Sequence, residues 1–210
     1  MEPLNVDPWA EAVDRYAEKT ELFPDERKII DALEPGRTLD LGCGTGRVTR
    51  FLKDAGHTVE GVDICPEMVE RARILHPDIP FTVGDAAQLP PLGQFDNIVF
   101  SFNGLDCIYP ETRRNDAVRG IHRLLKLGGT FVYSTHNWLW LLKPSRRTLR
   151  QIRHYEGPYY VDRMKIGDLI LYYSNPLGEA AWLRDFGFRE VRKYGGALDA
   201  WNYYTAVKVS

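Results

Sequence analysis

Three glycines at alternating positions are the residues of this chain best suited to ligand chemistry. Gly42, Gly44 and Gly46 follow a short apolar run that begins at Leu39, and a helical pattern begins at Arg47. Where a strand turns into a helix through such a loop, backbone N–H groups can approach a ligand closely, because no Cβ atom stands in the way. The dinucleotide pattern Gly-x-Gly-x-x-Gly needs its third glycine one residue later, where this chain has Arg47. The loop is therefore predicted to contact a ligand without being a good pyrophosphate cradle.

Two acidic residues follow the next two apolar runs. Asp63 ends the run that begins at Thr58, and Asp85 follows the run that begins at Phe81. A carboxylate at the first place can accept hydrogen bonds from both hydroxyls of a ribose, and one at the second from an exocyclic amine. Either residue alone could equally cap a helix or lie in a solvated loop. Together with the glycine loop, the pair describes an adenosine laid across three strand ends.

The elements that must hold these residues alternate between strands and helices. Strands are predicted over 37–41, 58–62, 81–83, 95–101 and 130–134, and helices over 7–33, 47–55, 66–75 and 111–125. Strands separated by helices of this length imply right-handed crossovers and a mostly parallel sheet. Ligands of such sheets bind beyond the carboxyl ends of the strands, where both acids stand.

The last third of the chain completes the predicted fold. A strand is expected over 166–174, a helix over 176–186, a strand from 187 and a final strand over 203–209. We therefore expect an α/β fold: one doubly wound, mostly parallel seven-stranded sheet with helices on both faces. Residues 1–210 are expected to form one domain, in which 7–33 is a helical cap and 137–175 is an inserted lid over the substrate.

Composition excludes several classes of protein. The chain has 210 residues, a formal net charge of -2 and 44% hydrophobic residues. Its sequence pI of about 6.2 argues against a general nucleic-acid or membrane-surface binder. The longest apolar stretch, Trp138–Leu142, is too short to span a bilayer, and the N-terminus lacks a signal-peptide pattern. The three cysteines show no Cys-x-x-Cys spacing, so reduced thiols and a cytoplasmic location are expected.

Five pieces of sequence occur in an order typical of one protein family. They are Leu39–Gly46, Gly61–Met68, Gly84–Ala86, Phe95–Val99 and Leu124–Gly129. In these pieces the chain resembles the class I S-adenosylmethionine-dependent methyltransferases. The agreement covers residues 7–135, and 183–188 extend it. The resemblance implies a Rossmann-like fold with S-adenosyl-L-methionine as cofactor, but it leaves the acceptor open, because this scaffold serves many substrates.

The resemblance also implies roles for single positions. The implied cofactor-binding residues are Tyr16, Asp40, Gly42, Cys43, Gly44, Gly46, Asp63, Ile64, Met68, Gly84, Asp85, Ala86, Ser101 and Phe102. The glycines would pass the methionine moiety, with Asp40 near its ammonium group. Asp63 would bind the ribose hydroxyls and Asp85 would face the adenine amine. Tyr16 would close over the cofactor from the N-terminal cap, whereas Trp9 is expected to pack in the core.

The acceptor side is predicted from the ends of the fourth and fifth strands and from the lid. The candidate substrate-binding residues are Asn103, Tyr109, His136, Asn137, Arg146, Arg150, Tyr159 and Tyr172. His136 is also the candidate general base, with a loop histidine bonded to the backbone as the equal alternative. The two strand ends carry no paired carboxylates, so no metal is expected. Arg146, Arg150 and Arg153 share one face of a predicted basic helix. Each arginine alone is expected to lie on a solvated face, whereas the segment as a whole indicates an anionic or sugar-like acceptor.

The leading hypothesis is an enzyme that transfers a methyl group from S-adenosylmethionine to an oxygen or nitrogen of a small molecule, by in-line displacement. The first alternative is methylation of RNA or protein through the basic segment 137–165, which the overall acidity disfavours. A subunit that binds the cofactor without turnover is the second, and a nicotinamide oxidoreductase is the last. Neither nucleic acid nor a membrane is an expected partner, and homodimer formation is left open.

Overall fold

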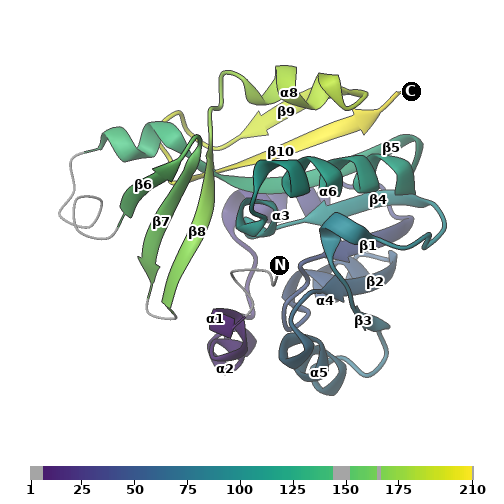
Figure 1. Cartoon of the computed structure of the whole chain (residues 1–210). Helices are drawn as coiled ribbons and strands as arrows, with labels where there is room; N and C mark the ends of the chain where they lie inside the picture. The colour runs from purple at the N-terminus through teal and green to yellow at the C-terminus, as the bar shows by residue number, and fades with distance from the viewer. Residues whose placement is uncertain (1–6, 144–151, 165–166, 210) are drawn as a thin grey trace.

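A parallel sheet forms the centre of the protein in the computed structural model, which describes residues 7–143, 152–164 and 167–209 (Figure 1). Its strands are β1 (Arg37–Leu41), β2 (Thr58–Asp63), β3 (Phe81–Val83), β4 (Phe95–Phe100) and β5 (Leu125–Asn137). They lie in the order β3-β2-β1-β4-β5, and each neighbouring pair is parallel. The antiparallel strands β9 (Phe188–Tyr194) and β10 (Trp201–Lys208) extend the sheet beyond β5.

Helices cover both faces of the sheet. The helices are α1 (Asp7–Ala10), α2 (Val13–Ala17), α3 (Pro24–Asp31), α4 (Arg47–Asp54), α5 (Pro66–Leu75), α6 (Glu111–Leu124) and α8 (Glu179–Asp185). Short 3₁₀ turns are η1 (Ala86–Gln88), η2 (Gly104–Cys107) and η3 (Trp138–Leu142). Alternation along the strands supplies two cores, because successive side chains point to opposite faces. On β4, Ile98 packs with α6 and α8, whereas Val99 packs with α3, α4 and α5.

The long strand β5 joins the main sheet to the lid. On one edge it pairs with β10 from Thr130 to His136. On its other edge it pairs first with β4, as far as Tyr133. Beyond the end of β4, His136 and Asn137 pair with β8 (Gly167–Ser174). The lid strands therefore stand directly past the carboxyl end of β4, where η2 begins.

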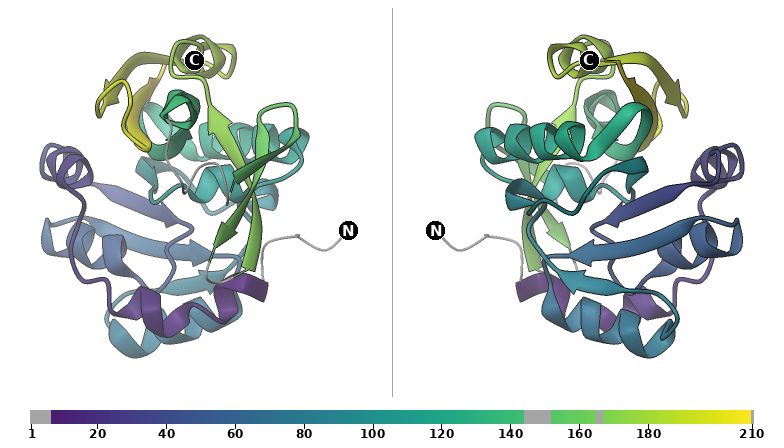
Figure 2. Two further views of the ribbon diagram at one scale, coloured as in Figure 1. Left: turned by 90° about the vertical axis from the view of Figure 1, so that its left-hand side faces the viewer. Right: turned by 90° about the vertical axis from the view of Figure 1, so that its right-hand side faces the viewer.

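The lid is a small antiparallel sheet of β6 (Ile152–Glu156), β7 (Tyr159–Met164) and β8. Figures 1 and 2 show α1 at the foot of this sheet, and α1 contacts both β8 and α5. The N-terminal segment thus bridges the lid and the cofactor side of the sheet.

The prediction of fold class is confirmed, but the strand count differs. The seven strands expected in the sheet correspond to β3-β2-β1-β4-β5-β10-β9, and the lid adds β6, β7 and β8, of which β8 is the strand predicted over 166–174. Strands β6 and β7 were not predicted from the sequence. The predicted single helix over 7–33 is wrong: α1, α2 and α3 are separate, because Pro24 starts α3 and cannot continue a preceding helix.

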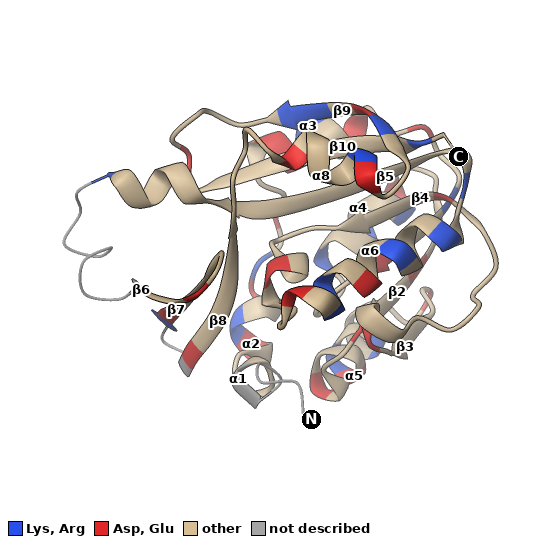
Figure 3. Ribbon diagram, turned by 45° about the horizontal axis from the view of Figure 1, so that its top comes forward, with Lys and Arg blue, Asp and Glu red and all other residues tan. Residues whose placement is uncertain are grey.

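The predicted basic helix of the lid is also wrong where the structure describes it. Arg153 lies exposed on strand β6 and pairs in register with Val161. Arg146 and Arg150 lie outside the described residues. The described charges of 137–165 are Lys143, Arg153 and Arg163 against Glu156 and Asp162, so they nearly balance. Figure 3 accordingly shows mixed charges over the lid and the helices.

Candidate functional site

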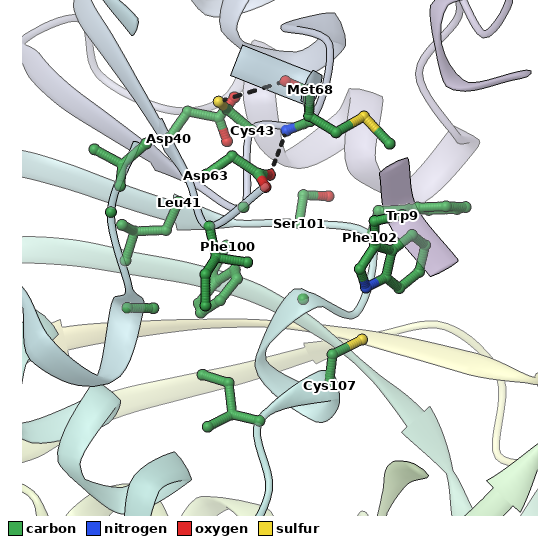
Figure 4. A pocket seen from close by; sticks show the side chains of 18 of the residues that line it. Trp9, Asp40, Leu41, Cys43, Asp63, Met68, Phe100, Ser101, Phe102 and Cys107 are labelled. Carbon is green, nitrogen blue, oxygen red and sulfur yellow. Dashed lines mark hydrogen bonds between the residues drawn. The ribbon is translucent and has the colours of Figure 1, made fainter. Parts of the chain in front are cut away.

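A pocket lies at the carboxyl ends of β1, β2 and β4, and Trp9 of the N-terminal helices lines one side of it (Figure 4). Its lining includes all but one of the predicted cofactor-binding residues: Tyr16, Asp40, Gly42, Cys43, Gly44, Asp63, Ile64, Met68, Gly84, Asp85, Ala86, Ser101 and Phe102. Residues from five separate parts of the chain meet there, because the carboxyl ends of parallel strands share one edge of the sheet.

The glycine loop presents bare backbone to the pocket. Gly42 and Gly44 adopt φ angles of 59° and 55°, which favour glycine. A Cβ on Gly42 would lie 2.8 Å from the ring of Phe100, whereas one on Gly44 would meet no atom within 4 Å. The Gly44 backbone therefore faces open space on the pocket side. Gly46 is the exception among the predicted residues: it caps α4, faces His76, and does not line the pocket.

Asp63 ties the glycine loop to the end of β2. Its Oδ2 accepts a hydrogen bond from the Gly44 N–H at 2.7 Å (Figure 4), and its Oδ1 accepts one from the Cys65 N–H at 2.9 Å. Burial raises the pKa of this carboxyl above its usual range, although the backbone donors oppose the shift. The side chain is only partly covered by protein, so its oxygens remain available at the pocket edge.

Asp40 lies deeper in the same pocket. Burial raises the pKa of its carboxyl to about 7, and the Thr49 hydroxyl, which donates to Oδ2 at 2.6 Å, opposes the shift. A carboxyl with this pKa changes charge near neutral pH, so a cation bound beside it would favour the ionised form.

Asp85 has a partner that the sequence did not indicate. Its Oδ1 accepts a hydrogen bond from the Ala87 N–H at 2.8 Å, which caps η1. Its Oδ2 pairs with the guanidinium of Arg113 from the first turn of α6, and Arg113 also lines the pocket. No pattern near Arg113 marks it, because the two residues are 28 positions apart and only the crossover into α6 brings them together.

A buried ion pair behind the glycine loop is a second feature that the sequence did not indicate. The Glu26 carboxylate of α3, only 2% exposed, accepts hydrogen bonds from Arg47 at 2.6 and 3.0 Å. It also accepts one from the Phe23 N–H at 3.0 Å and one from the Ser101 hydroxyl. Arg47 and Ser101 both line the pocket, so Glu26 holds the loop after β1 against the end of β4.

Aromatic rings close the outer side of the pocket. Trp9 and Tyr16 both line it, with ring centroids 5.6 Å apart, so Trp9 does more than the core packing we expected. Tyr16 in turn meets Phe102 edge-on. The Lys19 ammonium lies 4.2 Å from the Tyr16 ring centroid and 4.1 Å from that of Phe102. Burial, with Arg15 and Arg47 nearby, lowers the pKa of Lys19 to about 8.

The predicted substrate-binding residues scatter more widely. Tyr109 lines the pocket, and its hydroxyl donates to Glu156 of the lid at 2.7 Å. The buried Tyr159 hydroxyl donates to the Ile108 carbonyl at 2.9 Å, which anchors the lid beside Tyr109. Tyr172 lies under the guanidinium of the buried Arg114, outside this pocket.

Two predicted substrate residues are placed as supports for the backbone. The Asn137 side chain is fully buried, donates to the Ala197 and Asp199 carbonyls and accepts from the Leu139 N–H. Its amide is therefore engaged with the backbone of its own surroundings, and substrate contact by Asn137 stays a prediction. Asn103, also buried, has a φ of 64° and ties the end of β4 to β5 through its N–H, which donates to Ser134 Oγ at 2.7 Å.

His136 does not line the pocket either, but it has a specific partner. Its ring Nδ1 lies 2.8 Å from Oδ2 of Asp106, a fully buried carboxylate of η2. The residues on either side of this turn, Gly104 and Cys107, do line the pocket.

Comparison with known proteins agrees with this geometry. The family model of a methyltransferase domain matches residues 38–129. An uncharacterized methyltransferase of Synechocystis sp. is 37% identical over 114 residues, covering 51% of this chain and 53% of that protein. A demethylmenaquinone methyltransferase of Beutenbergia cavernae is 38% identical over 122 residues, covering 53% and 48%. The chain thus spans about half the length of these curated relatives.

The fold has solved counterparts over nearly its whole length. The CcbJ methyltransferase from Streptomyces caelestis superposes with a TM-score of 0.74 at 20% identity, covering 98% of both chains. Residues 38–129 are thus similar to a methyltransferase domain, and the fold of the chain is that of solved methyltransferases. Within the described ranges, no helix is long and apolar enough to cross a membrane.

Proposed function

We propose that this protein transfers the methyl group of S-adenosylmethionine to an oxygen or nitrogen atom of a small molecule. The observation that carries the proposal is the pairing of the open Gly44 backbone with the Asp63 carboxylate at one pocket edge. A backbone without side chains suits a close ligand, and a carboxylate beside it suits vicinal hydroxyls. The residues present therefore fit the cofactor of this class. That cofactor supplies an electrophilic methyl group on a sulfonium, and the protein supplies binding and orientation.

Different residues of the chain would bind different parts of the cofactor. Asp63 would hold the ribose hydroxyls, with Ile64 and Met68 as apolar walls for the base. Asp40 would lie beside the ammonium group, which favours its ionised form. Asp85 is already paired with Arg113, so its free capacity toward an adenine amine is reduced. Trp9, Tyr16 and Phe102 exclude water from the side that faces the acceptor.

Two features favour a small acceptor over RNA or protein. Trp9 and Tyr16 of the N-terminal helices and the lid-linked Tyr109 line the pocket, so a small acceptor suits it better than a polymer. The formal net charge is -2, and the described part of 137–165 nearly balances. One curated relative is named for methylation of demethylmenaquinone, a small molecule.

Cofactor binding is tested first, by thermal unfolding with and without S-adenosylhomocysteine. We expect a rise in Tm at saturating ligand, because a ligand that binds only the folded state stabilises that state by mass action. Most of this rise should be lost in Asp63→Ala. Asp78→Ala is the matched control, since Asp78 lies on the surface in a pair with Arg50, and its shift should equal that of the wild type. Absence of any shift in the wild type would refute the proposal.

Turnover is tested with methyl-labelled S-adenosylmethionine and a fractionated cell extract. We expect a labelled small molecule detectable by mass spectrometry, formed together with S-adenosylhomocysteine. Label found only in RNA or protein would contradict the small-molecule acceptor. Binding without any labelled product would favour a subunit that only binds the cofactor.

A further inference from the structure

Asp106 is a buried carboxylate whose hydrogen bonds converge on His136. It is 0% exposed, on the short turn η2. Its Oδ1 accepts a hydrogen bond from the Thr135 hydroxyl at 2.8 Å. Its Oδ2 lies 2.6 Å from the backbone N and 2.8 Å from the ring Nδ1 of His136. A carboxylate buried this deeply needs such donors, because an unpaired charge in the interior is costly.

This arrangement selects one form of the imidazole ring. An ionised carboxylate only accepts hydrogen bonds, so Nδ1 of His136 must carry the proton that it donates to Asp106. The other nitrogen, Nε2, then has a free lone pair in the neutral ring. Among the described residues, no hydrogen bond engages Nε2. The ring is further held by Tyr173 of β8, whose centroid lies 5.0 Å away.

The pair stands against the wall of the pocket, on the lid side. Asp106 lies between Gly104 and Cys107, which both line the pocket. Tyr173, the neighbour of the His136 ring, packs in one cluster with Cys107 and Trp9. Figure 4 shows the Cys107 side chain rising from η2 toward the side of Trp9 and Phe102.

A second approach to the pocket wall runs along β10. Trp201 is the register partner of His136, and its ring meets that of Phe102 at 5.7 Å. The His136 side chain remains 15% exposed, so part of it reaches solvent.

We propose that His136 is the proton acceptor of the transfer reaction and that Asp106 is its positioning residue. This inference rests on the proposed function. The acceptor's lone pair forms the bond to the methyl carbon, the carbon–sulfur electron pair stays on sulfur, and the acceptor's proton passes to Nε2 of His136. The imidazolium so formed is stabilised by Asp106. The substrate class follows: the methylated atom bears a proton that must leave, as in a hydroxyl, or in an ammonium group that gives its proton to Nε2 and so frees its lone pair before the attack.

The geometry is tested first, without any acceptor, by long-range ¹H–¹⁵N spectra of the histidine side chains. The spectra are recorded at about pH 8.5, well above the ordinary imidazole pKa. The chain has five histidines, and His136→Gln identifies the signals of His136. We expect a protonated Nδ1 and a bare Nε2 in the wild type, and a change of tautomer in Asp106→Asn, whose amide can donate to Nδ1. Thr135→Val is the control, since it removes the hydroxyl bonded to Oδ1 and to the His136 carbonyl but neither contact of Oδ2 with His136, so it should keep the tautomer while losing stability. A wild-type ring protonated on Nε2 would overturn the proposal.

The catalytic role is tested with the acceptor that the labelling experiment identifies. His136→Gln should lower kcat by about 10²- to 10⁴-fold while the Kd of S-adenosylhomocysteine stays unchanged. Unchanged kcat in this variant would overturn the proposal and leave the proposed function standing. Absence of S-adenosylhomocysteine binding in the wild type would instead overturn the proposed function, and the catalytic role with it.

Discussion

Glu26→Gln should be strongly destabilising, although Glu26 belongs to no recognised motif. Its carboxylate is 2% exposed and accepts two hydrogen bonds from Arg47, one from the Ser101 hydroxyl and one from the Phe23 N–H. The glutamine keeps the shape but removes the charge, so the guanidinium of Arg47 is left buried without an opposite charge. Burial by itself lowers the pKa of Arg47, and it is the hydrogen bonds and charge of Glu26 that raise it overall.

The magnitude follows from these contacts. Removing one partner of a buried ion pair costs about 3–5 kcal/mol. Because glutamine still offers one acceptor oxygen, we expect the lower end, about 3 kcal/mol. For a chain of this length that corresponds to a fall in Tm of about 6–12 °C.

Urea unfolding followed by circular dichroism measures this loss directly. The matched control is Lys28→Gln on the same helix, whose pair with Asp25 is exposed and should change stability by less than about 1 kcal/mol. Replacing both partners, as in Glu26→Leu with Arg47→Met, should recover much of the loss, because no unpaired charge remains. A Glu26→Gln variant as stable as the Lys28→Gln control would refute the reasoning.

Two further outcomes follow from the pocket. The pKa of Asp40 is about 7 in the folded protein and about 4 in the unfolded chain. Between these pH values the folded state retains a proton that the unfolded state has lost. The free energy of unfolding therefore falls as pH rises through this range. Asp40→Asn should therefore gain stability relative to the wild type between about pH 4 and 8 in urea titrations, and parallel curves would contradict the raised pKa. Gly44→Ala should cost only about 1 kcal/mol of stability but weaken S-adenosylhomocysteine binding in calorimetry by about tenfold or more, because its Cβ enters open pocket space. Gly56→Ala shares the positive φ and the open surroundings but lies off the pocket, so an equal loss of affinity there would contradict this explanation.

Local signals were sufficient for much of the fold. Apolar runs such as 37–41 and 95–101, with intervening helical patterns, predicted the parallel sheet, because burial on both faces demands continuous apolar strands. The lid was harder. Tyr159 and Tyr172 were predicted as substrate residues, but β7 and β8 use them to pack against Ile108 and Arg114. Which face of a lid strand is buried depends on what it packs against, and composition does not record this.

The candidate site also combines residues that the sequence predicts with residues that only the structure shows. The glycines and Asp63 are recognisable because their roles depend on the backbone conformation of a few consecutive residues. Asp106 and Arg113 carried no such signal, since each acts on a partner at least 28 positions away.

The sequence by itself determined the class of this protein: where the strands end, which loop lacks side chains and which acid follows the second strand. All of these are local properties, fixed by turn geometry and strand periodicity. Only the tertiary structure decided that Glu26 pairs with Arg47 behind the glycine loop, that the Asn137 amide bonds to backbone groups and that Asp106 lies against the ring of His136. Those facts depend on which distant segments the sheet order brings together, and on how little water remains between them.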